Sequence, residues 1–214
     1  WPNSEIEIEK QKVAIKNFKG IDKDYFLSKV AKAYMALLGD GRGGVFCENS
    51  LDNPKSWNRK TQMEVKLGQF NVVMTNPPFG SKIPVRGESI LKQYEFAHSW
   101  KYDKKAKKWT KGKLKESETP QILFIERCIK LLAPGGKLGI VLPDGILGND
   151  KLGYIRSYLI EKAKILAIID VPIETFMPHT STKTSIVILR KLEDGEKLYS
   201  DYNVFMASGN LWSQ

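Results

Sequence analysis

Two short apolar runs place the strongest limit on how this chain can fold. Residues 138–142 (LGIVL) and 165–171 (ILAIIDV) are almost wholly apolar, and a helical pattern at 154–162 separates them. An unbroken apolar run of this length is typical of a strand buried on both faces, and two such strands joined through a helix are the repeating unit of a parallel sheet. The sequence therefore predicts an α/β fold with a mostly parallel sheet.

The other expected elements alternate in the same way. A helix is predicted to begin after Asp24 as its N-cap and to end at Gly39, with apolar residues from Phe26 to Leu38 on one buried face. A polar linker precedes the strand at 70–75, and residues 133–136 (APGG) predict a turn. We expect further strands at 13–21, 45–47, 184–189 (antiparallel) and 203–207, and a second helix at 120–132.

Positive charge is concentrated in one stretch. The net charge is +10, and residues 101–117 (KYDKKAKKWTKGKLKES) hold eight lysines against two acidic residues. With Trp100, Tyr102 and Trp109, such a stretch could follow a phosphate backbone and offer aromatic faces to bases. A solvated, flexible insertion explains the charge equally well. The candidate contacts to a DNA backbone are Lys104, Lys105, Lys107, Lys108 and Lys111.

Composition excludes several other classes of protein. No run approaches the roughly 18 apolar residues of a membrane span, and no cationic and apolar leader opens the chain. Cys47 and Cys128 have no metal-type spacing, so we expect buried free thiols in a reducing cytoplasm. His98 and His179 are the only histidines, which is too few for a metal cluster, and there is no P-loop.

The segment Asn76-Pro77-Pro78-Phe79 offers a specific chemistry at the end of a predicted strand. Two consecutive prolines end the strand and stiffen the backbone. The side-chain carbonyl of Asn76 and the backbone carbonyl of Pro77 can accept the two hydrogens of an exocyclic amine, and Phe79 can stack on the ring that bears it. This arrangement would direct the amine lone pair to a methyl donor by positioning and electrostatics.

With these residues the chain resembles the modification (M) subunit of type I restriction-modification systems, a family of S-adenosylmethionine-dependent, adenine-specific DNA methyltransferases. The resemblance runs from about residue 18 to 207. Besides the tetrapeptide it includes GIDKD at 20–24, ENSLDNP at 48–54, PQILFIERCIKLLAPGGKLGIVLPDGIL at 120–147 and IIDVPIETFMPHTSTKTSIVIL at 168–189. It implies a Rossmann-like class I methyltransferase sheet with a C-terminal antiparallel hairpin, and transfer of a methyl group to a flipped adenine.

The resemblance also implies the functions of single residues. Asp22 would bind the ribose hydroxyls of S-adenosylmethionine, although a helix-capping function is the alternative, and Glu48 or Asn49 would lie near the cofactor adenine. Asn76, Pro77, Pro78 and Phe79 would hold the target adenine. Phe176 would pack on the same base, with a core contact beneath its loop as an equal alternative. The segment 143–145 (PDG) is read as a tight turn at the same edge of the sheet.

One expected part of the family pattern is not found in this chain. The glycine-rich cofactor loop should precede Asp22, yet the only glycine before it is Gly20, and the chain opens on Trp1. We therefore expect 1–214 to be a partial catalytic domain that lacks the first strand, with a polar leader at 1–12 and a Lys-rich insertion at 100–118. Such a chain should bind S-adenosylmethionine weakly.

The expected partners follow from the same resemblance. They are double-stranded DNA and the specificity and restriction subunits of one system, in a bacterial or archaeal cytoplasm, with no membrane. Two other functions stay open from the sequence. One is a methyltransferase of RNA bases or protein glutamine, and the other is an inactive DNA-binding or assembly subunit.

Overall fold

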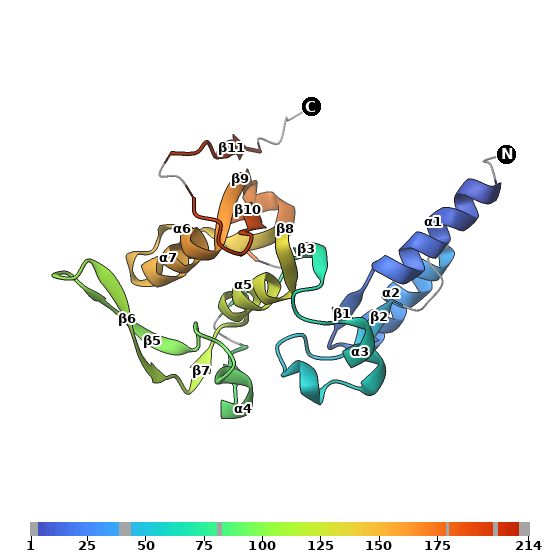
Figure 1. The fold of residues 1–214 in the computed structure, drawn as a ribbon, viewed down its shortest axis with the longest axis horizontal. Coiled ribbons are helices and arrows are strands. Elements are labelled where there is room, and N and C mark those ends of the chain that lie inside the picture. Colours follow the sequence, from blue (N-terminus) through green and yellow to red (C-terminus); the bar gives the residue numbers. More distant parts are fainter. Residues whose placement is uncertain (1–3, 39–43, 81–82, 179, 199–200, 210–214) are drawn as a thin grey trace. The chain divides into compact units, whose positions relative to one another are not determined.

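The computed structural model describes residues 4–38, 44–80, 83–178, 180–198 and 201–209 (Figure 1). The chain divides into two compact units, residues 1–66 and 67–214. Each unit is described by itself below.

The first unit combines helices with a small parallel sheet. Strand β1 (Gly20–Asp22) pairs in parallel with β2 (Val45–Cys47), and α2 (Tyr25–Leu37) contacts both strands. The remaining elements of the unit are α1 (Ser4–Asn17), the 3-10 turn η1 (Pro54–Ser56) and α3 (Arg59–Glu64). The last two occupy the stretch that we expected to be a plain polar linker.

Two expectations for this unit are wrong. Residues 13–17 form the end of helix α1 instead of a strand, and the helix takes in most of the predicted polar leader. Its Glu, Lys, Gln and Ala residues have high helix propensity, which outweighs the β-branched Ile6, Ile8, Val13 and Ile15. The expected N-cap of α2 is confirmed, because the Asp24 carboxylate accepts the N–H of Leu27 at 2.9 Å. Gly39 lies outside the described residues.

The apolar face of α2 is exposed, although its spacing predicted a buried one. Phe26 is 70% exposed and Leu37 is 86% exposed, while Ser28 is the buried residue of the helix. Strands β1 and β2 have only three residues each, so they cover one narrow side of a 13-residue helix. The periodicity correctly indicated an amphipathic helix, but it carried no information about what covers it.

The second unit is built on a five-stranded sheet in the order β11-β9-β10-β8-β3. Its strands are β3 (Phe70–Thr75), β8 (Leu132–Pro143), β9 (Ala163–Val171), β10 (Thr184–Lys191) and β11 (Phe205–Ser208). β3 is parallel to β8 and β11 is parallel to β9, whereas β10 lies antiparallel between β8 and β9. Four strands therefore share one direction, which agrees with the predicted, mostly parallel sheet. The fifth strand, β10, is antiparallel, which agrees with the hairpin predicted within 168–189.

Helix α5 (Pro120–Leu131) packs its predicted apolar stripe against this sheet. The helix contacts β8 and β3, and Ile122, Ile125, Cys128 and Ile129 are buried with Leu138, Ile140 and Leu142 of β8. The alternate residues of β8 are half-buried or exposed, so the strand is buried on one face only. At the sheet edge, β3 exposes Val72 and Met74.

The predicted turn at 133–136 is also wrong, because these residues belong to β8. The pairing shifts between Phe70 opposite Leu132 and Val72 opposite Lys137, which marks an irregularity in the ladder. Gly135 has φ of +74°, and a Cβ on Gly136 would lie 2.8 Å from the Phe70 carbonyl oxygen. Glycine at both positions lets the strand continue through a bulge.

The Lys-rich stretch forms an antiparallel hairpin. The alternative expectation, a flexible insertion, does not agree with this structure. β5 (His98–Asp103) pairs antiparallel with β6 (Lys108–Leu114). Around it lie β4 (Val85–Arg86), which pairs with β7 (Ser117–Glu118), and the short helix α4 (Glu88–Leu91). The unit is completed by α6 (Asp144–Gly148), η2 (Asp150–Leu152), α7 (Gly153–Lys162) and η3 (Ile173–Phe176).

Candidate functional site

The tetrapeptide Asn76-Pro77-Pro78-Phe79 follows β3 directly, as predicted. Asn76 is exposed, and its side chain has no hydrogen-bond partner among the residues that the structure describes. Pro77 is buried, which fixes the backbone beneath the amide. The carboxamide is therefore presented on a rigid support with its hydrogen-bonding capacity unused, which is the state that a binding group requires.

Phe176 and Phe79 meet at this strand end. Their ring centroids are 6.4 Å apart with an interplanar angle of 89°, an edge-to-face contact. Phe176 ends η3, which follows β9, and in the sheet β8 and β10 lie between β9 and β3. The loop after β9 therefore extends past the ends of β8 and β10 to bring the two predicted base-stacking residues together, and both rings are only half-buried.

A group of polar side chains that the sequence did not single out lies at the same end of the sheet. We call it the strand-end network, and it consists of Asp144, Asp170, Lys183, Ser185 and Ser208. Lys183 Nζ is 3.2 Å from Asp170 Oδ2 and 3.9 Å from Asp144 Oδ2. The Ser185 hydroxyl donates to Asp144 at 2.8 Å, and the Ser208 hydroxyl donates to Asp170 at 3.3 Å.

This network ties the ends of four strands to one another. The backbone N–H of Asp144 donates to the Lys183 carbonyl at 3.0 Å, and Asp170 Oδ1 is buried without a partner among the described residues. The tight turn predicted at 143–145 is wrong, because Asp144 begins helix α6. A sequence signal was present, since Asp170 and Lys183 are charged residues placed at the ends of apolar strands.

In the first unit the three predicted cofactor residues lie together at the ends of two paired strands. The N–H of Glu48 donates to the Asp22 carbonyl at 3.0 Å. Asp22 Oδ1 accepts the N–H of Asp24 at 2.7 Å, and Oδ2 has no partner among the described residues. Asp22 thus retains one free carboxylate oxygen, while Asp24 alone caps α2.

Glu48 and Asn49 are more fully engaged within their own loop. Glu48 Oε1 accepts the Asn58 backbone N–H at 2.8 Å, the Asn58 side-chain amide and the Thr61 hydroxyl at 3.3 Å, so it holds the beginning of α3. The Asn49 amide donates to Asp52 at 2.8 Å and accepts from the N–H of Leu51 at 3.1 Å. Asn49 is thus engaged through both its oxygen and its nitrogen, whereas Glu48 Oε2, like Asp22 Oδ2, has no partner among the described residues.

The two tryptophans of the hairpin contact an aromatic side chain of α7. Trp100 stacks on Tyr154 at 5.5 Å with an interplanar angle of 5°, and Trp109 meets the same ring edge-on at 5.8 Å. A Cβ on Gly153 would lie 2.7 Å from Trp109, so this glycine permits the close approach. Trp100 and Trp109 are therefore half-buried and engaged with Tyr154, and Tyr102, at 44% exposed, is the most accessible aromatic residue of the three.

Buried charges of α5 hold the segment that leads into the hairpin. Glu126 is fully buried, and its two oxygens accept the N–H groups of Glu95 and Phe96, each at 3.0 Å. Lys130 Nζ lies 2.7 Å from Glu126 Oε1. Arg127, 1% exposed, donates from Nε to the Tyr94 hydroxyl at 2.9 Å. These bonds satisfy charges that would otherwise be costly to bury.

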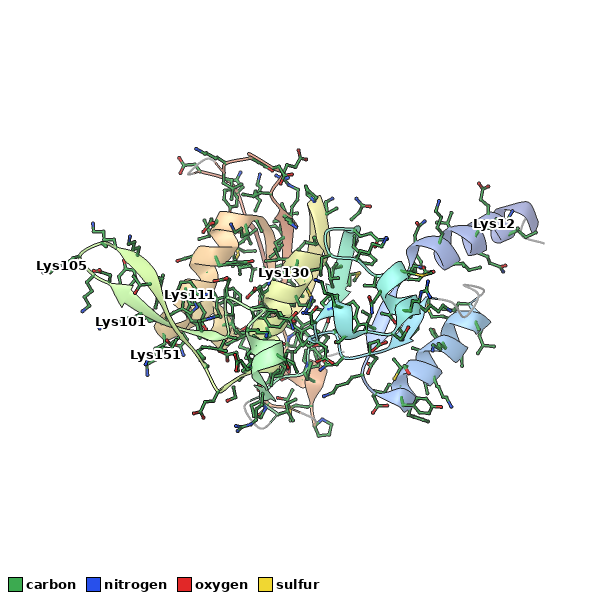
Figure 2. All side chains as sticks on the ribbon, turned by 60° about the horizontal axis from the view of Figure 1, so that its bottom comes forward. Lys12, Lys101, Lys105, Lys111, Lys130 and Lys151 are labelled. Carbon is green, nitrogen blue, oxygen red and sulfur yellow. The ribbon has the colours of Figure 1, made fainter. Side chains whose placement is uncertain are left out.

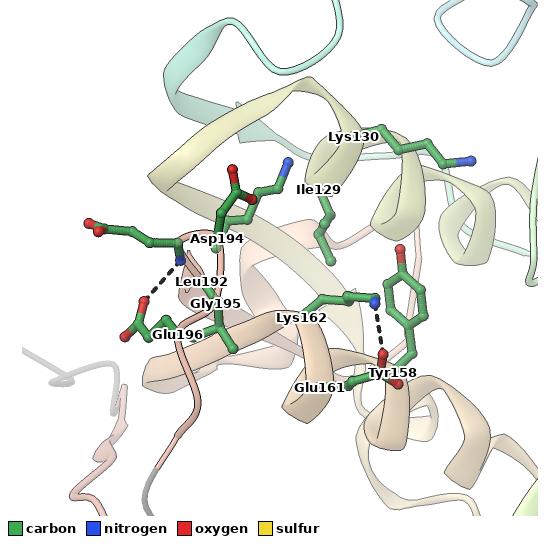
Figure 3. Close-up of a pocket in the computed structure, with 11 residues that line it drawn as sticks. Ile129, Lys130, Tyr158, Glu161, Lys162, Leu192, Asp194, Gly195 and Glu196 are labelled. Atoms are coloured by element: carbon green, nitrogen blue, oxygen red, sulfur yellow. Dashed lines mark hydrogen bonds and ion pairs between the residues drawn. The ribbon is translucent and has the colours of Figure 1, made fainter.

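A cavity of about 320 Å³ lies at the other end of the sheet, near the start of β9 and the end of β10 (Figure 3). It is lined by residues of α5, α7, the end of β10 and the turn after it, and its charged members are Lys130, Glu161, Lys162, Lys191, Glu193, Asp194 and Glu196. Lys191 donates to the Leu132 carbonyl at 2.7 Å, and burial lowers the pKa of its ammonium group. Glu196 forms a two-point pair with Arg190, which lowers the pKa of Glu196 to about 2.

The cysteines and possible metal ligands add no reactive centre to the described regions. Burial raises the pKa of the Cys128 thiol to about 12, so it stays protonated, whereas Cys47 is exposed and not buried as expected. Within residues 4–38, 44–80, 83–178, 180–198 and 201–209, no group of three or more His, Cys, Asp or Glu side chains could hold a metal ion. His179 lies outside these ranges. In the same ranges, no helix has the length and apolar character that crossing a membrane would demand.

Comparison with known proteins gives the family. The model of the N-6 DNA methylase family matches residues 3–209, which is nearly the whole chain and includes the tetrapeptide and Phe176. The chain belongs to the N-6 DNA methylase family. Among curated relatives, the type I restriction enzyme EcoEI methylase subunit of Escherichia coli is 29% identical over 146 residues, which are 67% of this chain and 24% of that protein. The type II methyltransferase M.XhoI of Xanthomonas vasicola is 28% identical over 127 residues, 57% of this chain and 20% of that protein.

Solved structures show the same fold. The EcoKI M protein superimposes with a TM-score of 0.57 at 23% identity over 81% of this chain and 31% of its own. A protein from Listeria monocytogenes described as a class I S-adenosylmethionine-dependent methyltransferase gives a TM-score of 0.62 at 20% identity, over 90% of this chain and 49% of its own. The predicted class I methyltransferase fold is therefore confirmed. The chain spans about a quarter of the length of the first curated relative.

Proposed function

We propose that residues 1–214 are part of the catalytic domain of an adenine-N6-specific DNA methyltransferase, the M subunit of a type I restriction-modification system. The observation that carries the proposal is the end of β3, where the unpartnered amide of Asn76 stands on buried Pro77, and Phe79 meets Phe176. Membership of the N-6 DNA methylase family supports an exocyclic amine as the group that reacts.

In the proposed reaction the chain positions the target base. The Asn76 side-chain carbonyl and the Pro77 backbone carbonyl accept the two hydrogens of the adenine amine, which turns its lone pair out of conjugation with the ring. Phe79 stacks on the adenine, and Phe176 closes the site from the loop after β9. A base can reach these residues only after leaving the duplex, so the reaction includes base flipping. The amine nitrogen held by Asn76 and Pro77 would gain the methyl group that S-adenosylmethionine supplies and would lose a proton.

S-adenosylmethionine would supply the methyl group. In the first unit, the free oxygen of Asp22 suits the ribose hydroxyls, and the loop at Glu48 and Asn49 would lie near the adenine of the cofactor. Gly20 is the only glycine that precedes Asp22, so we propose that tight binding needs a glycine-rich loop beyond this sequence. Calorimetry tests this part: micromolar affinity of residues 1–214 for S-adenosylmethionine would contradict it.

The proposed partners are double-stranded DNA and the specificity and restriction subunits of the same system, in a bacterial or archaeal cytoplasm. Their support lies in the relatives, which include methylase subunits of type I restriction enzymes. One solved relative was described in a study of complex assembly in a type I restriction-modification system, with a TM-score of 0.61.

The proposal is tested by methyl transfer from labelled S-adenosylmethionine. The full-length gene product, with any specificity subunit encoded beside it, is incubated with unmodified duplex DNA, and the nucleosides are separated after digestion. We expect label in N6-methyladenine, formed about 10²- to 10³-fold more slowly with Asn76→Ala. Label in RNA or protein instead of DNA would indicate a different methyltransferase. Complete lack of transfer together with DNA binding would indicate an inactive binding subunit.

A further inference from the structure

The hairpin of β5 and β6 has two chemically different faces. The register pairs Trp100 with Lys111 and Tyr102 with Trp109, so these four side chains share one face. On the other face, Lys101 pairs with Thr110 and Asp103 pairs with Lys108. Alternation along the two strands has thus placed the aromatic residues on one face and Lys101 and Lys108 on the other, while Lys104, Lys105 and Lys107 lie in the turn between the strands.

The aromatic face fastens the hairpin to α7. Trp100 and Trp109 both contact Tyr154 in the first turn of that helix, and Lys111 pairs with Glu95 at 2.7 Å on the same side. Trp109 lies one residue from the start of β6, so these contacts hold the hairpin along most of its length, and the turn at 104–107 extends beyond them. Figure 2 shows Lys105 at the free tip and Lys151 near the base.

The other face and the tip form a basic row in which five ammonium groups stand against one carboxylate. It consists of Lys101, Lys104, Lys105, Lys107 and Lys108, and none of these has an ion-pair partner within the described part of the chain. Its single carboxylate, Asp103, is engaged in the turn, where Oδ1 accepts the N–H groups of Lys105 and Ala106 at 2.8 and 3.0 Å. Like charges held this close repel one another, and a polyanion relieves that repulsion.

The position of the hairpin relates it to the catalytic strand end. Helix α7 connects β8 to β9, so its first turn follows the end of β8 where Asp144 lies, and its last turn precedes the start of β9. Tyr154 is in the first turn, and the hairpin is therefore fastened at the same end of the sheet as Asn76 and Phe176. A duplex that delivers a base to Asn76 must pass this end.

We infer that the hairpin is a rigid arm that binds the phosphate backbone of the DNA whose adenine is methylated, through Lys101, Lys104, Lys105, Lys107 and Lys108. This inference rests on the proposed function. The row offers ammonium groups without a neighbouring apolar patch, which suits phosphates and sequence-independent contact, whereas a protein partner would need an apolar centre. Lys111 is not part of the arm's DNA contact, because it faces α7 and is paired with Glu95.

The salt dependence of DNA binding tests the arm directly. The full-length gene product, with any specificity subunit encoded beside it, is titrated onto fluorescent duplexes with and without the target site between 50 and 200 mM KCl. The slope of log Kd against log salt counts the phosphates contacted, at about 0.9 for each. We expect the triple variant Lys104, Lys105 and Lys107→Gln to lower that slope by about 2 to 3 on both duplexes.

Two controls use the hairpin itself. The same three positions changed to Arg keep their charge and should keep the slope of the native protein. Lys108→Gln should lower the slope by about 0.9, and Lys111→Gln, which removes one charge from the paired face, should leave it unchanged. Equal thermal unfolding midpoints for all variants will show that the anchored face is intact.

The outcomes separate the arm from the proposed function. An unchanged slope in the triple variant, or an equal change in Lys108→Gln and Lys111→Gln, would overturn the inference even where adenine methylation persists at saturating DNA. Loss of assembly with partner subunits at an unchanged slope would overturn it in favour of an acidic protein partner. A reduced slope supports the arm whether or not methyl transfer is found, and methyl transfer is scored by the separate label experiment.

Discussion

The two ends of the five-stranded sheet differ in how their polar groups are used. At the end that carries Asn76 and Asp170, an amide and a carboxylate oxygen lack partners among the described residues, and two half-buried rings meet. At the opposite end, which holds the cavity, Arg190 pairs with Glu196 and Lys191 binds a backbone carbonyl. In this sheet, polar groups without hydrogen-bond partners therefore indicate the proposed catalytic end, whereas the cavity lies at the opposite end.

The largest effect should come from Asn76→Ala. The substitution removes one of two acceptors for the target amine, and loss of one such group from a preorganised site typically lowers the rate by about 10²- to 10³-fold. Affinity for duplex DNA should stay the same, since the phosphate contacts are untouched. Single-turnover methylation and DNA titration measure the two quantities. Asn71→Ala, on the exposed side of β3, is the matched control, and a loss of DNA binding in Asn76→Ala would contradict the assignment.

A smaller effect is expected from Phe176→Ala. Stacking on one base is worth about 1–3 kcal/mol, so kcat/KM should fall roughly ten- to a hundredfold. A duplex with 2-aminopurine at the target position reports flipping by its fluorescence, which should decrease in the variant. Phe205→Ala removes an exposed ring, 64% accessible, from β11 and serves as the control. Normal flipping with lowered stability would instead show that Phe176 is a core contact.

A pair of glycine substitutions compares the stability of the two ends. Gly136→Ala, at the cavity end, places a Cβ 2.8 Å from the Phe70 carbonyl oxygen and 2.9 Å from that of Ala133. We expect it to lower the free energy of unfolding by about 1–3 kcal/mol. Gly145→Ala, beside the catalytic end, meets nothing within 4 Å and lies in helix α6, so it should be neutral or stabilising. Urea unfolding checks both, and equal losses would contradict the bulge geometry.

The smallest effect concerns acid stability. The Arg190 guanidinium holds the pKa of Glu196 at about 2, below its ordinary value of 4.5. The pair therefore stabilises the fold above about pH 4.5, and this contribution is lost as the pH falls toward 2. Glu196→Gln should remove the pH-dependent part of this stability between pH 5 and 2 and leave methyl transfer unchanged. Unfolding midpoints of the native protein and the variant, measured across that range, test whether stability falls with pH as expected. Glu174→Gln is the control.

The sequence predicted the parts of the fold that depend on local pattern and turn chemistry. The strand that ends before Pro77, the apolar stripe of α5 and the N-cap at Asp24 are all as expected. In each case the cause lies within a few residues: proline blocks the ladder, spacing defines a face, and a carboxylate accepts nearby N–H groups.

The sequence could not predict features that depend on distant partners. One such feature is whether the apolar face of a helix is buried. Helices α2 and α5 have the same kind of apolar spacing, but the apolar face of α2 is exposed. The tryptophans of the hairpin are another, because their partner Tyr154 lies some 50 positions along the chain. Asp170 and Lys183 meet only through the strand order, so neither stood out before the sheet was known.

The antiparallel strand β10 has a consequence for how the protein is made. It lies between β8 and β9 and pairs with both, yet it is synthesised after both of them. While the ribosome is still translating residues 172–191, the facing edges of β8 and β9 have no partner, and open edges of apolar strands are prone to association with other chains. The sheet is therefore open between β8 and β9 until β10 is available to join them.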